Sequence, residues 1–96
     1  MEKLLKLVKL SLSISEESII KDDEIKLNIK SAIKDIERQG IRVDIENPLI
    51  ISAIVMYVKG NFGNTDIKQK EYSLKAYNSL CCNLGLSTEY KENNND

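Results

Sequence analysis

The sequence predicts an all-α fold: a small bundle of three to four helices around a central hydrophobic helix at about residues 48–60. Two observations lead to this prediction. Residues 49–58 are apolar almost without interruption, whereas three other segments place apolar residues at helical spacing between charged ones. The apolar run is too short for a membrane span, which needs roughly 20 such residues. We therefore expect one helical domain over residues 1–90, with the other helices packed around the central one, and a disordered tail over residues 91–96.

The central helix has a clear start. Asn47 can accept a hydrogen bond from an early backbone N–H, and Pro48 occupies a position that needs no N–H. Gly60 and Gly63 are expected to end the helix, with Phe62 between them as a hydrophobic anchor. Because the helix has no polar side, we expect five of its side chains to be largely buried: Ile50, Ala53, Ile54, Tyr57 and Val58.

The first segment, residues 2–12, predicts a helix that buries one side and exposes lysines on the other. The acidic stretch that follows, residues 13–24, lacks the glycine and closing glutamate of a calcium loop, so Asp22 or Asp23 is predicted to cap the next helix. The apolar side of the first helix comprises Leu4, Leu5, Val8 and Leu12, and the lysines are Lys3, Lys6 and Lys9.

A second helix is predicted from about Asp22 to Gln39, followed by Gly40 as its C′ residue. Leu27 lies outside its apolar stripe. The stripe consists of Ile25, Ile29, Ala32, Ile33 and Ile36, and an extended connector should then place Ile41, Val43 and Ile45 on the core.

A last helix is predicted from Thr65 or Asp66, as its cap, to about Leu84, with Gly85 ending it. Tyr72 and Tyr77 are expected to bury their rings while their hydroxyls reach water or a partner. The apolar stripe consists of Leu74, Tyr77, Leu80, Cys81 and Leu84.

The composition argues against catalysis, a metal or a cofactor. Histidine is absent, which removes the usual general base and the commonest metal ligand. Cys81 and Cys82 are adjacent, so they match no zinc spacing and at most one of them faces the core. With 14 basic and 15 acidic residues, the chain has no general nucleic-acid footprint. Lysines interrupt the N-terminal apolar residues, so no signal peptide is predicted and a cytoplasmic location is expected.

Residues 47–64, Asn-Pro-Leu-Ile-Ile-Ser-Ala-Ile-Val-Met-Tyr-Val-Lys-Gly-Asn-Phe-Gly-Asn, resemble the second half of tailed-bacteriophage head–tail connector proteins, also called DNA-packaging or head-completion adaptors. That family shows a proline, small and apolar residues, then Tyr-Val-Lys-x-Asn-Phe-Gly. Its tyrosine-bearing helix and Leu-x-Leu-Ser-x-x-Tyr ending are matched by Tyr72, Tyr77 and residues 84–90. Residues 7–14 occupy the place of the family's Leu-Lys-x-x-Leu-Arg-Ile, although Ser13 stands where members often carry arginine.

The resemblance implies a subunit that assembles in roughly a dozen copies into a ring beneath the portal protein. Such a ring extends the DNA channel without sequence-specific binding, meets a tail-side connector or stopper protein, and contacts no membrane. It would assemble in the host cytoplasm and end in the virion neck. The lysines of the first helix and the acidic segment 16–24 suggest complementary faces between copies. The candidate contact residues are Leu27, Asn61, Phe62, Asn64, Leu86 and Tyr90.

Two other classes stay open. A protein-interaction module, such as an antitoxin or accessory enzyme subunit, would share the missing active site. A helix-turn-helix regulator would need a basic recognition helix, and the most basic helix faces here carry three lysines.

Overall fold

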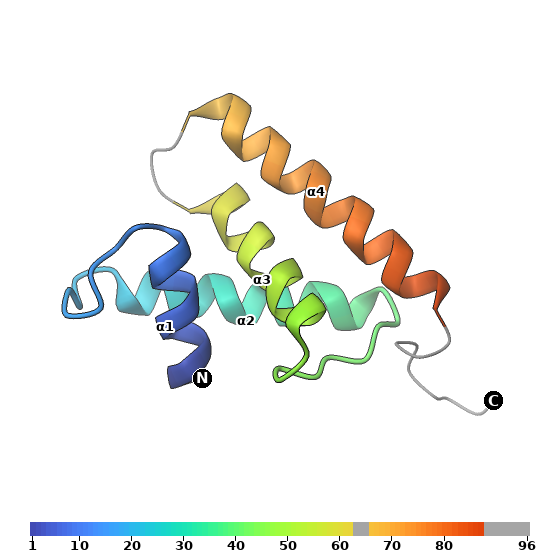
Figure 1. Cartoon of the computed structure of the whole chain (residues 1–96), viewed down its shortest axis with the longest axis horizontal. Helices are drawn as coiled ribbons and strands as arrows, with labels where there is room; N and C mark the ends of the chain where they lie inside the picture. The colour runs from blue at the N-terminus through green and yellow to red at the C-terminus, as the bar shows by residue number, and fades with distance from the viewer. Residues whose placement is uncertain (63–65, 88–96) are drawn as a thin grey trace.

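The computed structural model describes residues 1–62 and 66–87. That part of the chain is all-helical and contains α1 (Glu2–Ser11), α2 (Asp22–Arg38), α3 (Pro48–Asn61) and α4 (Ile67–Leu86) (Figure 1). The predicted fold class is therefore confirmed, with each helix within a few residues of its predicted bounds. Residues 91–96, the predicted tail, lie outside the described residues.

Helix α3 is the centre of the bundle. It contacts α1, α2 and α4, and it crosses in front of α2 with α4 alongside (Figure 1). Its residues Ile50, Ala53, Ile54 and Val58 are completely buried, as predicted. Tyr57 is only half-buried, and its ring meets that of Tyr77 edge-on with the ring centroids 5.3 Å apart.

The other helices place their predicted stripes on α3. Ile33, Leu74 and Leu80 are half-buried at the edge of the core. The fully or almost fully buried side chains outside α3 are Leu4, Leu5, Val8, Ile25, Ile29, Ala32, Ile36, Ile41, Phe62, Tyr77, Cys81 and Leu84.

The start signals of α3 and α4 and the glycine after α2 work as the sequence predicts. The Asn47 side chain accepts a hydrogen bond from the Leu49 N–H at 2.8 Å, and that of Asp66 accepts from the Lys68 N–H at 3.0 Å. Gly40, with φ of +82°, follows the end of α2 in the left-handed region that glycine adopts without strain. Local side-chain and backbone chemistry is enough to set these boundaries.

Two glycines that the sequence predicts to end helices lie inside them. Gly60 lies inside α3, where a Cβ would come within 2.5 Å of Leu74 Cδ2, so this glycine permits the close approach of α4. Gly85 does not end α4 either. The helix continues to Leu86, because a helical glycine costs only about 1 kcal/mol and Leu84 holds this turn against the core.

The connector between α2 and α3 follows the prediction only in part. Ile41 is fully buried and Val43 is half-buried, but Ile45 is 43% exposed. The chain turns at residues 44–47, where the Asn47 N–H donates to the Asp44 carbonyl at 2.9 Å, and this turn directs Ile45 away from the core.

Candidate protein-interaction surface

The acidic segment is tied to α1 through Lys9, which is buried rather than solvated. Its side chain is 4% exposed, and its Nζ lies 2.8 Å from Asp22 Oδ1. It also donates to the carbonyl oxygens of Glu16, at 3.1 Å, and Ser18, at 2.5 Å. The prediction of an exposed lysine was wrong because the chain after α1 folds back over this position. Asp22 consequently pairs with Lys9, and α2 begins after Lys21 without a side-chain cap.

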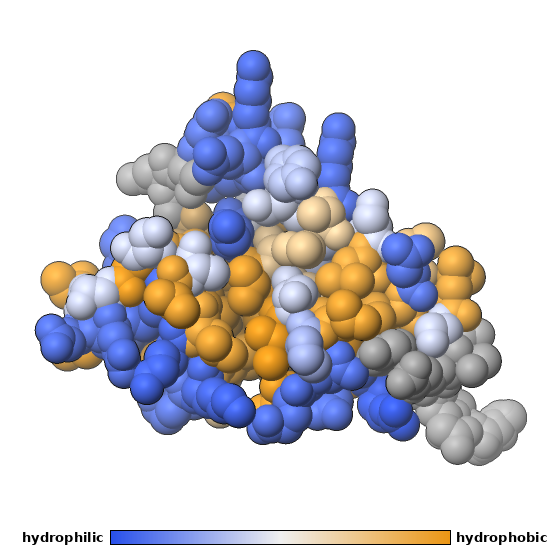
Figure 2. Space-filling model, viewed as in Figure 1, coloured by the Kyte–Doolittle hydropathy of each residue, from blue (hydrophilic) through white to orange (hydrophobic). Residues whose placement is uncertain are grey.

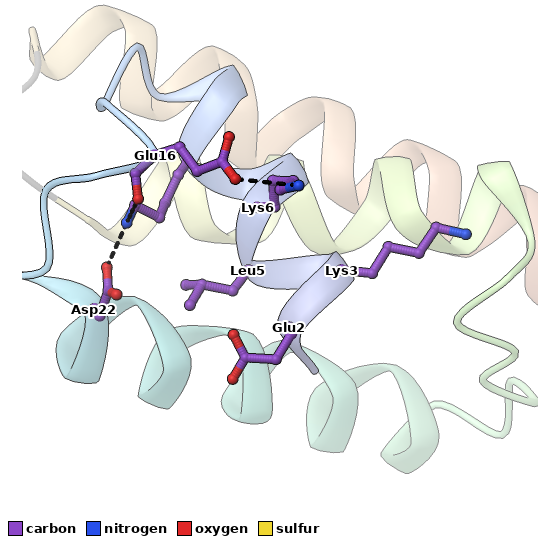
Figure 3. Close-up of a pocket in the computed structure, with 7 residues that line it drawn as sticks. Glu2, Lys3, Leu5, Lys6, Glu16 and Asp22 are labelled. Atoms are coloured by element: carbon purple, nitrogen blue, oxygen red, sulfur yellow. Dashed lines mark hydrogen bonds and ion pairs between the residues drawn. The ribbon is translucent and has the colours of Figure 1, made fainter.

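A hollow of about 320 Å³ beside this pair is lined by charges of both signs (Figure 3). Glu16 and Asp22 turn toward the lysines of α1, and Lys6 Nζ lies 3.1 Å from Glu16 Oε2. Lys3 pairs with Glu46 at 3.4 Å. The lysines of α1 are thus paired with carboxylates of the same chain, and the complementary face for a neighbouring copy stays a prediction.

A second polar cluster joins α4 to α2. The Tyr77 hydroxyl donates to Asp35 Oδ2 at 2.5 Å, and Arg38 and Gln39 also donate to this carboxylate. The hydrogen bond from Tyr77, followed by that from Arg38, lowers the pKa of Asp35 below its usual value. Burial, followed by the bond to Asp35, raises the pKa of Tyr77. The cluster thus links α4 to the end of α2 through hydrogen bonds.

The two cysteines differ in their exposure. Cys81 is buried and Cys82 is exposed, as the helical spacing predicts. Burial raises the pKa of the Cys81 thiol, which keeps it in the unreactive protonated form.

Within the residues described, no group of three or more His, Cys, Asp or Glu side chains could hold a metal ion. No helix in the same residues is both long and apolar enough to cross a bilayer.

The most distinctive surface feature is an apolar groove between α3 and α4, about 530 Å³ in volume. The expectation that α3 is surrounded on all sides was wrong, because α1 and α4 leave one of its sides open. Figure 2 shows a band of hydrophobic surface across this region, with hydrophilic side chains above and below it. We call this feature the α3–α4 groove; its lining residues are Ile51, Ser52, Val55, Met56, Lys59, Gln69, Tyr72, Ser73 and Ala76.

The edge of the α3–α4 groove is also apolar. Tyr72 is 75% exposed rather than buried as predicted, because it lies on the side of α4 that faces away from Tyr77. Leu49, one turn before the lining residues of α3, is 44% exposed. Sequence reasoning missed the groove, although a helix that is apolar all round, with only three others to cover it, was a signal that it could remain partly open.

Of the candidate contact residues that the structure describes, three are exposed and one is buried. Leu27 on α2 and Leu86 at the end of α4 are exposed, by 65% and 78%. Asn61 is exposed and donates to the Tyr57 carbonyl at 2.8 Å. Phe62 belongs to the core, where it is 4% exposed and its ring centre lies 5.5 Å from Lys21 Nζ. Asn64 and Tyr90 lie outside the described residues.

Comparison of this chain with protein-family models, with curated proteins and with solved structures finds no match.

Proposed function

We propose that this chain is a structural, non-enzymatic subunit of a phage or prophage head–tail connector. In this role, copies form a ring beneath the portal protein, extend the DNA channel and dock the tail. The observation that carries the proposal is the α3–α4 groove: the most hydrophobic helix of the chain is left open along one side. Exposed apolar surface of this kind marks interaction sites in small proteins.

The location of the groove supports the connector role in particular. Its α3 residues, from Ile51 to Lys59, lie within the stretch 47–64 that resembles connector proteins. The same stretch both builds the core, through Ile50 and Ile54, and presents the open side. The stretch that resembles connector proteins therefore includes residues that a partner can contact as well as residues that pack the core.

The polar chemistry of the chain is also consistent with a structural role. Lys9 and Asp22 hold the chain after α1, and Tyr77 and Asp35 join α4 to α2. Both clusters are used within the fold. With a net charge of −1, the chain lacks the excess of cations that binds DNA tightly, as suits a channel through which DNA slides.

The test is assembly on a portal. The chain would be co-expressed with the portal protein encoded nearest to its gene, and complexes would be purified through the portal and imaged by electron microscopy. We expect a ring of density on one end of the portal. Val55→Asp, which places a charge in the groove, should abolish the ring, whereas Leu10→Asp, at a 74% exposed position on α1, serves as the surface control. A stable two-fold dimer that buries α3 and ignores the portal would refute the proposal.

The groove also favours a second candidate, a protein-interaction module such as an antitoxin or accessory subunit. An amphipathic helix of a partner could lie between α3 and α4, where apolar residues of both helices line the groove. The mass of the complex distinguishes the two functions. A one-to-one complex with a single partner supports the module, and a closed ring of many copies supports the connector.

A further inference from the structure

We propose that the α3–α4 groove of one copy receives the tip of the isoleucine loop, residues 12–21, from a second copy of this chain. Ile19 and Ile20 at this tip are 74% and 88% exposed. They are adjacent large apolar side chains that the core does not use. The groove is an apolar recess on the same molecule that its own helices leave open. Joining the two would bury both exposed apolar surfaces at once.

The isoleucine loop is held in a defined shape. Lys9 donates to the carbonyl oxygens of Glu16 and Ser18, immediately before the two isoleucines. The Asp22 N–H donates to the Ile19 carbonyl at 3.2 Å on their other side. Because the backbone on both sides is hydrogen-bonded, docking orders little that is not already ordered, which reduces the entropy lost on binding.

Apart from Lys21, whose Nζ lies 5.5 Å from the Phe62 ring centre, the charged residues beside the isoleucines are carboxylates, opposite in sign to the lysines at the groove. Glu17, Asp23 and Glu24, beside the isoleucines, are exposed and form no ion pair within the described residues. No carboxylate is among the described residues that line the groove, and Lys59 lies at its end. Lys68 precedes Tyr72 by four residues on α4, so helical spacing places the two on the same side of the helix, with Lys68 at the outer edge of the groove. Such pairing sets the orientation of the loop more than its affinity.

The loop and the groove are different surfaces of the chain, so a single docked loop makes a head-to-tail contact. The loop projects beyond the start of α2, whereas the groove lies between α3 and α4 (Figure 1). Within one copy, neither Ile19 nor Ile20 is among the residues that line the groove. When one loop of a pair docks, one free loop and one free groove remain, and repetition gives a ring or a filament. The inference rests on the proposed connector function, which requires such a repeating contact.

Disulfide trapping between two variants of the full chain, each with one new cysteine, tests the contact. Both carry Cys82→Ser, and Cys81 stays because it is buried. One adds Ile20→Cys and the other adds Ser52→Cys, a nearly isosteric change in the groove. Mixed under mild oxidation, they should give a heterodimeric disulfide in several-fold higher yield than a matched control. The control is Leu10→Cys in place of Ile20→Cys, because Leu10 is 74% exposed but lies on α1.

Two outcomes overturn the proposal: a yield equal to that of the Leu10→Cys control, or a preference for linking two identical variants, which would place loop against loop or groove against groove. A charge exchange adds a measurement that misfolding cannot imitate. Lys59→Glu in the groove variant should reduce the yield several-fold, and Glu17→Lys in the loop variant should restore it. Failure to restore the yield would overturn the proposed orientation.

This test needs no portal, so the two proposals can fail separately. If the chain assembles on the portal but the cross-link stays at the control level, the loop contact is wrong and the connector function stands. If the cross-link forms but the chain ignores the portal, the contact stands and the connector function is wrong.

Discussion

Replacing Lys9 with methionine tests the buried ion pair that holds the isoleucine loop. Methionine keeps the apolar stem packed but removes the ammonium group, which leaves Asp22 without its partner and two loop carbonyls without a donor. Breaking a buried pair in this way costs about 3–5 kcal/mol. The Asp22 side chain is 20% exposed and can regain some water, so we expect a loss at the lower end, about 3 kcal/mol.

The measurement is urea unfolding followed by circular dichroism at neutral pH. A domain of this size has about 5–10 kcal/mol of stability, so the variant should remain folded at 25 °C. Lys6→Met is the matched control, because the side chains of Lys6 and Glu16 are 62% and 67% exposed and such a pair contributes less than about 1 kcal/mol. If Lys9→Met loses no more than Lys6→Met, Lys9 does not hold a buried pair and the loop is not anchored as described.

Three further predictions concern the packing of the bundle, and urea unfolding checks each of them. Ile54→Ala should lose about 2–4 kcal/mol, because the side chain is fully buried, and a loss under about 0.5 kcal/mol would show that α3 is peripheral. Tyr77→Phe should lose about 1–2 kcal/mol at pH 7 by removing a hydrogen bond to a carboxylate. Because this bond lowers the pKa of Asp35 in the folded state, its contribution is present above the unfolded pKa, near 3.9, and is lost as the pH falls through the folded pKa. The stability of the variant should therefore fall less than that of the wild type on acidification from pH 5 to pH 2, and parallel curves would contradict the assignment. Gly60→Ala should destabilise by about 1–3 kcal/mol despite the better helix propensity of alanine, because its Cβ meets Leu74; a gain in stability would show that α4 can move away freely.

The contact residues named from the sequence show how far a pattern alone identifies a surface. Leu27 was selected because it lies off an apolar stripe, and it is indeed exposed. Phe62 belongs to a loop that the core was expected to leave free, yet its ring lies in the core, as the expectation of a hydrophobic anchor also states. Whether a loop residue is available to a partner depends on the direction in which the chain leaves the helix, and local composition does not encode that direction.

The sequence by itself determined the four helices, their inward sides and most of their ends. Periodicity, the caps at Asn47 and Asp66 and the left-handed Gly40 act within a few residues, so they can be read without knowing what packs against them. Only the tertiary structure decided that Lys9 is buried and that Gly60 is a packing contact rather than a stop. It also decided that α3 is open along one side. Each of these features depends on a segment distant in sequence: the loop that folds over α1, the side chain of Leu74 on α4, and the distance between α1 and α4 across the central helix.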